Sequence, residues 1–152
     1  MILRETNDAK KNSEYLNDRG LFSKPFPITS IKYEDFSNSD IVNHEYNYAV
    51  ITSPKAIKVL NKIVSNNKTV FSKSSRIFTI GIETKNKLNK FNFSNVFNAT
   101  GNSQSLIELI LKSTCRSDFG LWIAAKDRSI DLKKILKKSN RRIEILEGYK
   151  TL

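Results

Sequence analysis

Two hydroxyl side chains and a proline, Thr52, Ser53 and Pro54, directly follow a short apolar strand pattern at 49–51. Ser53 can cap a helix, because its oxygen accepts a hydrogen bond from a backbone N–H that has no partner within the helix. Pro54 suits the first helical position. In open α/β sheets, ligands bind at this same place, at the carboxyl ends of the strands. The pattern therefore allows two roles, helix capping and ligand contact, of which the local chemistry favours capping.

Other residue types restrict the expected chemistry to hydrogen bonding and charge. The chain has one cysteine, Cys115, and one histidine, His44, which argue against a Cys/His zinc site and exclude an internal disulfide. The sequence contains no Walker-type phosphate loop, no G-x-G-x-x-G fingerprint and no G-x-S-x-G nucleophile turn. We therefore expect neither a metal nor a cofactor. The single cysteine suits a reducing compartment, the cytoplasm.

The charge balance favours an anionic partner. Lys and Arg number 26 against 15 Asp and Glu among 152 residues, so the net charge is +11. Nucleic acid, a membrane surface and a polyanionic small molecule all fit this charge, and a compositional bias toward Lys and Asn explains it equally well. No segment is apolar enough to span a membrane or to serve as a signal peptide. Hydrophobic residues make up 39%, which suffices for a packed core.

A first β-α-β unit is predicted at 1–35. Its helix spans 8–19, and Thr6 or Asn7 would cap it. Two strands and one helix are too small to be stable independently. We therefore expect this unit to associate with another copy of the chain.

A longer α/β region is predicted after the polar segment 34–45. Within 36–148, Ser103 and Ser129 would cap helices and Thr84 would open a short one. The strands predicted along the whole chain lie at 1–3, 26–33, 49–52, 77–80, 95–100, 120–125 and 141–149. Strands that alternate with helices predict a parallel α/β sheet.

The order of these segments resembles the uroporphyrinogen-III synthase family. Residues 2–31 resemble its opening strand ending in Arg, its first helix, a Gly and a strand begun near a proline. "YNYAVITSPKAIKVL" resembles an apolar strand followed by Thr-Ser-x-x-Ala, and "IGIETKNKLNKF" is similar to a Gly-x-x-Thr-x-x-x-Leu turn. The remaining similar segments are "NATGNSQSLIELI", "LWIAAKDRSIDLKKIL" and "EILEGYKTL". Together these six motifs cover nearly the whole chain in the family's order.

Several positions depart from the family pattern. "LRET" stands in place of the usual Thr-Arg-Pro, and Lys85 replaces a small residue after the turn threonine. "AAKDR" keeps the acidic Asp127 and the basic Arg128 but lacks the family's glycine. The sequence ends at Leu152, where the family's return segment would begin. The resemblance therefore implies a relative without the C-terminal return, weakly active or inactive alone.

The resemblance implies both a fold and an activity. The fold is α/β and uroporphyrinogen-III synthase-like. It combines a flavodoxin-like parallel-sheet domain at 36–148, an N-terminal β-α-β unit at 1–35 from an incomplete second domain, and the start of a return linker at 149–152. The activity is that of a lyase of haem biosynthesis. It cyclises hydroxymethylbilane, a linear tetrapyrrole with eight carboxylates, to uroporphyrinogen III without cofactor or metal.

The same resemblance assigns site residues. The substrate-binding residues implied are Thr52, Ser53, Thr84, Arg4 and Arg128. The hydroxyls of Thr52 and Ser53 would line the cleft, and the two arginines would attract carboxylates, although Arg4 also fits a solvated strand end. Thr84 would offer its hydroxyl and a helix N-terminal amide to a carboxylate. Tyr149 matches the family's linker tyrosine, as a catalytic proton donor to the departing hydroxyl or as hinge packing.

Two other hypotheses stay open. A relative that has lost catalysis could serve as a binding or assembly module. A basic α/β domain could bind nucleic acid, which only the charge supports. We expect a polycarboxylate small molecule as the partner, with self-association through the incomplete first domain. We expect no membrane partner, and nucleic acid is not favoured.

Overall fold

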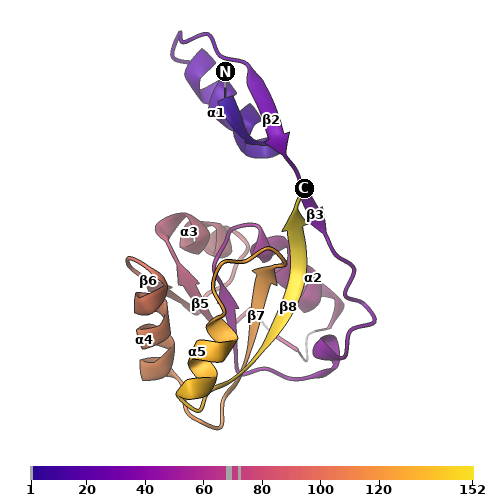
Figure 1. Cartoon of the computed structure of the whole chain (residues 1–152), viewed down its shortest axis with the longest axis vertical. Coiled ribbons are helices and arrows are strands. Elements are labelled where there is room, and N and C mark those ends of the chain that lie inside the picture. The colour runs from indigo at the N-terminus through magenta and orange to yellow at the C-terminus, as the bar shows by residue number, and fades with distance from the viewer. Residues whose placement is uncertain (1, 68–69, 72) are drawn as a thin grey trace. The chain divides into compact units, whose positions relative to one another are not determined.

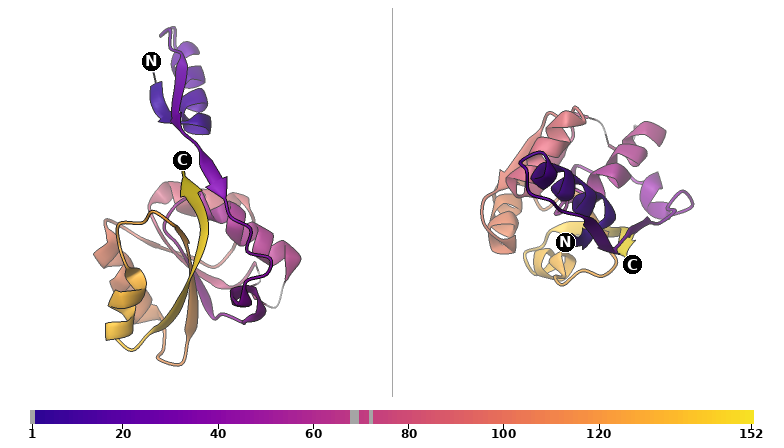
Figure 2. Two further views of the ribbon diagram at one scale, coloured as in Figure 1. Left: turned by 45° about the vertical axis from the view of Figure 1, so that its right-hand side comes forward. Right: turned by 90° about the horizontal axis from the view of Figure 1, so that it is seen from above.

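The computed structural model describes residues 2–67, 70–71 and 73–152, with side chains from Glu5 onward. The chain folds into two compact units (Figure 1; Figure 2). The smaller unit contains the residues up to Tyr33 together with Lys150–Leu152, and the larger contains Glu34–Tyr149. We refer to them as the first and the second unit.

The first unit is a β-α-β arrangement. It consists of β1 (Ile2–Glu5), α1 (Thr6–Asn17) and β2 (Pro25–Thr29). β1 pairs in parallel with β2, so that Ile2 lies opposite Pro25. The predicted strand-helix-strand order of this part of the chain is confirmed.

The cap of α1 differs from the prediction. Glu5 precedes the helix, and its carboxylate accepts a hydrogen bond from the backbone N–H of Asn7 at 3.3 Å. Thr6 is already the first helical residue, and its hydroxyl donates to the Thr29 carbonyl at 3.3 Å. The prediction that Thr6 or Asn7 caps this helix is therefore wrong. An acidic side chain one position earlier satisfies the free N–H and also suits the positive end of the helix dipole.

The chain passes between the units on β3 (Ile31–Tyr33) and on β8 (Arg142–Thr151). In the first unit, Ser30 and Leu152 exchange two backbone hydrogen bonds of 3.1 and 2.9 Å. In the second unit, the Glu34 N–H donates to the Gly148 carbonyl at 3.0 Å. The strand predicted at 26–33 is therefore interrupted at Ser30 and forms two strands, β2 and β3.

The second unit is built on a parallel sheet. Its strands are β4 (Tyr48–Ile51), β5 (Arg76–Ile80), β6 (Val96–Ala99), β7 (Phe119–Ala125) and β8. They lie in the order β8-β7-β4-β5-β6, and each neighbouring pair is parallel. The predicted parallel sheet is confirmed. The flavodoxin-like description holds for the layered parallel architecture, whereas the strand order is 3-2-1-4-5 from β6, not the 2-1-3-4-5 of flavodoxin.

Helices cover both faces of this sheet (Figure 1). α4 (Ser103–Ser113) and α5 (Leu132–Lys138) lie on one face, and α2 (Ala56–Asn66) and α3 (Ile82–Lys90) lie on the other. The core beneath α4 and α5 contains Tyr48, Val50, Phe78, Ala99, Leu106, Ile107, Ile110, Trp122, Ala124, Leu132, Leu136 and Ile143. The unit is therefore a three-layer α/β/α domain.

The central strand β4 is completely buried. A strand in a parallel sheet is covered on both faces, so it reads as a continuous apolar run. Gly120 on the neighbouring strand makes room for the ring of Tyr48, because a Cβ at Gly120 would lie only 2.3 Å from Tyr48 Cζ.

The polar segment 34–45 is part of the second unit. Phe36 is buried, and the ammonium group of Lys62 lies 5.1 Å from the centre of its ring. A short 3-10 helix, η1 (Asp40–Asn43), follows, and the hydroxyl of Ser39 accepts from the Ile41 N–H at its start.

Two predicted helix caps are displaced by neighbouring residues. Asn102 caps α4, because its Oδ1 accepts from the backbone N–H groups of Gln104 and Ser105 at 3.0 and 3.3 Å. Asp131 caps α5 and accepts from the Lys134 N–H at 3.0 Å. The predictions of Ser103 and Ser129 as caps are wrong, since Asn and Asp are at least as good caps. Ser103 is already the first residue of α4, and Ser129 lies two positions before the cap of α5.

Two other helices also begin elsewhere than predicted. α2 begins at Ala56 after Lys55, so Ser53 is not its N-cap; the Ser53 hydroxyl instead accepts from the Lys55 N–H at 3.3 Å in the preceding turn. α3 begins at Ile82 and not at Thr84, because Gly81 turns the chain with a φ of 85°. Thr84 therefore lies within the first turn of α3.

Candidate functional site

A cavity of about 320 Å³ lies in the second unit, on the sheet face covered by α4 and α5. Its lining residues come from the ends of β4, β5 and β7, from the loop after β7 and from the starts of α4 and α5. They are Thr52, Ile80, Ser103, Leu106, Trp122, Asp127, Arg128, Ser129, Ile130 and Leu132. We call this edge, where the parallel strands end, the carboxyl edge.

The strand order explains why the cavity forms there. From β4, the chain proceeds to β5 and β6 on one side and later to β7 and β8 on the other. The segments that follow β4 and β7 therefore lead to helices on opposite faces of the sheet, α2 and α5 (Figure 1). In open α/β sheets such a switch point opens a crevice at the carboxyl ends of the strands, where ligands bind. The cavity lies at this switch point.

Thr52 contributes a hydroxyl that is held in place. The indole N–H of Trp122 donates to Thr52 Oγ1 at 3.3 Å. Trp122 is only 4% exposed, so its ring belongs to the core while its edge reaches the cavity. A hydroxyl that accepts one hydrogen bond retains its own proton for donation. Thr52 can therefore donate a hydrogen bond to an acceptor on a ligand.

Arg128 contributes a cation whose position is also set by neighbours. Its Nη1 donates to a carboxylate oxygen of Glu147 at 2.6 Å and to the Ala125 carbonyl at 3.3 Å. The guanidinium carbon lies 5.6 Å from the ring centre of Trp122. Both hydrogen bonds come from Nη1, so neither uses Nε or Nη2. Arginine recognises carboxylates through such paired N–H groups.

Ser53, Thr84 and Tyr149, also predicted as site residues, lie outside this cavity lining. Ser53 is adjacent to Thr52 and is half-buried in the turn. Thr84 is 3% exposed in the first turn of α3. Tyr149 is 5% exposed, and it lies opposite Ala125 at the end of the sheet, where its carbonyl accepts from the Lys126 N–H at 2.9 Å. The side chain of Arg4 lies outside the described residues.

The cavity also contains residues that the sequence did not identify as site residues. Trp122 occupies its floor, and Ser103 and Ser129, predicted only as helix caps, line its wall. Their position in the sequence could have identified the two serines as site residues. Ser103 and Ser129 each follow a strand of a parallel sheet, and all such strand ends meet at one edge.

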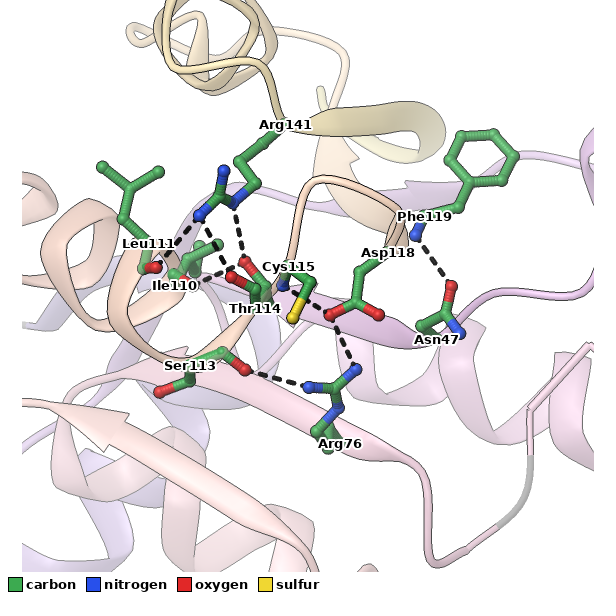
Figure 3. A network of polar contacts seen from close by, with 10 residues as sticks. All are labelled: Asn47, Arg76, Ile110, Leu111, Ser113, Thr114, Cys115, Asp118, Phe119 and Arg141. Atoms are coloured by element: carbon green, nitrogen blue, oxygen red, sulfur yellow. Dashed lines mark hydrogen bonds and ion pairs between the residues drawn. The ribbon is translucent and has the colours of Figure 1, made fainter.

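A network of arginine contacts occupies the other edge of the sheet, the amino edge, where the strands begin (Figure 3). Arg76 donates to the Ser113 carbonyl at 2.9 Å and to Asp118 at 3.1 Å. Arg141 donates to the Thr114 hydroxyl at 3.2 Å and to the Thr114 carbonyl at 3.0 Å. These cations satisfy carbonyls around the end of α4, as expected at a negative helix C-terminus. Their role is structural.

Within residues 2–67, 70–71 and 73–152, His, Cys, Asp and Glu side chains form no group of three or more that could hold a metal ion. Of the helices in the described part of the chain, none has the length and apolar character needed to cross a membrane.

The hydrogen bond between Thr52 and Trp122 can be tested by substitution. Thr52→Val should lower the free energy of unfolding by about 1 kcal/mol, because the buried indole N–H loses its acceptor. Trp122 is the single tryptophan of the chain, so tryptophan emission comes from this site, and we expect an emission shift when the hydrogen bond is lost. Urea denaturation followed by fluorescence measures both. Thr52→Ser, which keeps the hydroxyl, is the control, and equal behaviour of the two variants would contradict the assignment.

Comparison with known proteins identifies relatives of the chain. A family model described as uroporphyrinogen-III synthase HemD matches residues 10–152. A mutant uroporphyrinogen III synthase from Thermus thermophilus has a similar structure, with a TM-score of 0.66 and 13% identity over 100% of this chain and 63% of that one. A uroporphyrinogen-III synthetase from Helicobacter pylori is similar with a TM-score of 0.60 and 14% identity, over 86% of this chain and 57% of that one.

At these identities the structural likeness shows the fold alone. The chain spans less than two thirds of the length of either solved relative. A search of curated proteins gave no match. The family model nevertheless covers most of the chain. The chain therefore belongs to the uroporphyrinogen-III synthase family.

Proposed function

We propose that this chain binds hydroxymethylbilane and takes part in closing it to uroporphyrinogen III, a lyase reaction of haem biosynthesis. The observation that carries this proposal is the cavity at the carboxyl edge, where a held hydroxyl, Thr52, and a held cation, Arg128, line one space. Membership of the family, whose members are lyases of this kind, supports the same activity.

The size of the cavity and the charge of the chain bear on how the substrate would bind. At about 320 Å³, the cavity is at the small end of ligand pockets. It would hold one carboxylate-bearing pyrrole and not a whole tetrapyrrole, so the remaining rings would lie outside it. The net charge of +11 would favour the approach of a molecule with eight carboxylates.

The proposed binding residues are Thr52, Ser53, Thr84, Arg4 and Arg128. Thr52 would donate to a substrate carboxylate, and Arg128 would pair with one. Ser53 would act mainly by shaping the turn beside Thr52. Thr84 is buried, so the N-terminal amides around it in α3 would be the more direct contact.

The proposed reaction needs positioning more than a strong base. It begins with loss of the terminal hydroxyl, continues by ring attack through a spiro intermediate and ends with rearrangement that inverts the last pyrrole. Fixed hydrogen-bond donors and cations would hold the carboxylates and orient the reacting ring. Tyr149 is the proposed proton donor to the departing hydroxyl. The proposal requires neither a cofactor nor a metal.

The proposal extends to domain organisation and location. We assign 1–35 to an incomplete domain, 36–148 to an inserted domain and 149–152 to the start of a return linker. The cytoplasm would be the location, in keeping with a single unpaired cysteine, Cys115.

Arg128→Gln tests the binding site. We expect the dissociation constant for hydroxymethylbilane to rise about tenfold, because a charge-assisted hydrogen bond to a carboxylate is lost. Arg116→Gln is the matched control, since it removes the same charge from an exposed arginine that does not line the cavity. Quenching of Trp122 fluorescence measures binding.

The outcomes of this experiment separate the hypotheses. An equal loss of affinity in both variants would mean that net charge, and not this cavity, attracts the substrate. Binding without formation of the type III isomer would favour a non-catalytic binding module.

Tyr149→Phe tests the proton donor. We expect it to slow formation of the type III product more than Ser53→Ala does, because Ser53 would only shape the turn. Ser53→Ala should instead lower the free energy of unfolding by about 1 kcal/mol, because the Lys55 N–H loses the Ser53 hydroxyl as its acceptor. Product isomer analysis over time gives the rates. If Tyr149→Phe and the parent chain turned over equally fast, Tyr149 would not be the donor.

Self-association through the first unit is also part of the proposal. Four large apolar side chains of this unit are exposed: Phe22, at 86%, and also Leu21, Phe26 and Ile28. Surfaces of this kind promote association. Sedimentation equilibrium should show a dimer or larger species, which Phe22→Ser with Phe26→Ser shifts toward monomer. Phe91→Ser, an exposed phenylalanine of the second unit, should leave the distribution unchanged; a parent chain that stays monomeric would contradict the proposal.

A further inference from the structure

A second cavity, a groove of about 290 Å³, lies at the amino edge of the second unit's sheet. It is lined by Phe119, Lys133, Lys137, Arg141, Arg142, Ile143 and Glu144. Phe119 and Arg142 begin β7 and β8, so this groove is at the opposite edge from the candidate substrate cavity. We call it the basic groove.

The charge of the basic groove comes from one short stretch. Residues 133–142, "KKILKKSNRR", contain six Lys and Arg and no Asp or Glu. Lys133 and Lys137 are one helical turn apart on α5, about 6 Å along its axis, and both line the groove. All four lysines of α5 are exposed. The fold therefore brings a row of cations to a concave surface.

Two arginines have different roles in this groove. Arg141 is committed to the fold, since its Nη2 donates to the carbonyls of Leu111 and Thr114 at 3.2 and 3.0 Å (Figure 3). It adds positive potential from a rigid base. Arg142 is exposed, and its guanidinium carbon lies 4.6 Å from the ring centre of Phe119. This contact holds Arg142 at the groove while it remains accessible.

The one carboxylate of the groove is partly engaged elsewhere. Glu144 accepts a hydrogen bond from the Tyr46 hydroxyl at 2.6 Å. Burial, with the neighbouring Glu144 charge, raises the pKa of Tyr46, so the tyrosine stays protonated and keeps donating. The groove lining holds four Lys and Arg side chains against this one carboxylate, so the groove remains electropositive.

The shape and composition of the groove restrict the class of anion. Membrane-binding helices insert an apolar face, whereas Leu132 and Leu136 of α5 are buried in the core. A concave cationic track with an aromatic ring beside it is typical of sites that follow a single-stranded nucleic-acid backbone. We propose that the basic groove binds the phosphate backbone of single-stranded nucleic acid, with Lys133, Lys137 and Arg142 as its phosphate contacts.

This binding is independent of the proposed synthase activity, because it uses the other edge of the sheet. It also assigns a function to a charge that the sequence alone attributes equally to composition. With three phosphate contacts, the logarithm of the binding constant should fall against the logarithm of salt concentration with a slope of about −2.

The test uses the full chain and a fluorescein-labelled oligouridylate of about 12 nucleotides. Fluorescence anisotropy should show affinity about 15-fold weaker at about 200 mM than at about 50 mM NaCl. The triple variant Lys133→Gln, Lys137→Gln, Arg142→Gln should lose at least about tenfold in affinity and most of the salt slope. The control triple variant Lys11→Gln, Lys87→Gln, Lys90→Gln removes the same charge from exposed sites outside the groove. It should bind within about twofold of the parent chain.

Two results would overturn the proposal. Equal losses in the two triple variants would show diffuse attraction by net charge. Binding of phosphatidylserine vesicles without binding of the oligouridylate would assign the groove to a membrane surface. Lys133→Arg with Lys137→Arg keeps the charge and should keep the affinity, and Trp122 emission confirms that each variant is folded.

Discussion

Burial of β4 on both faces is the constraint on which the second unit depends. All four of its residues are inaccessible to solvent, with α4 and α5 on one side and α2 and α3 on the other. A polar side chain along such a strand needs a partner or costs free energy; among the described residues, the Tyr48 hydroxyl at the start of β4 is buried without one. On the neighbouring strand, the buried Thr79 shows how this is met, because its hydroxyl donates to the Ile51 carbonyl at 2.6 Å. The candidate substrate cavity and the basic groove both lie at the edges of this sheet, where side chains reach solvent.

The two edges use cations in different ways. At the amino edge, Arg76 and Arg141 satisfy backbone carbonyls around the end of α4, so part of the positive charge of the chain is structural. At the carboxyl edge, Arg128 is held by Glu147 against Trp122, beside a cavity that a ligand could enter. A count of charges in the sequence cannot separate these roles. Burial and hydrogen-bond partners do.

The fold could be predicted from the sequence further than the local details could. Apolar periodicity indicated the strands and helices, because each depends on spacing within one short segment. Their alternation along the chain indicated a parallel sheet. The helix starts were less well predicted. Asn102, Asp131 and Glu5 cap helices for which a nearby Ser, Thr or Asn was expected, since adjacent polar residues compete for the same N–H groups. The N-cap position of α2 lies two residues after Ser53, and α3 begins two residues before Thr84.

By itself, the sequence determined the family's order of motifs and the presence of Thr52 at a strand end, because these are properties of contiguous residues. Only the tertiary structure decided which strand ends meet. The reversal of strand order beside β4 places Thr52, Trp122 and Arg128 around one cavity. The same order left Tyr149 buried outside the cavity lining and gathered the lysines of α5 with Arg142 at the opposite edge. Contacts between distant segments depend on how strands pair and pack, and that pairing is set by burial of the whole sheet and not by any local pattern.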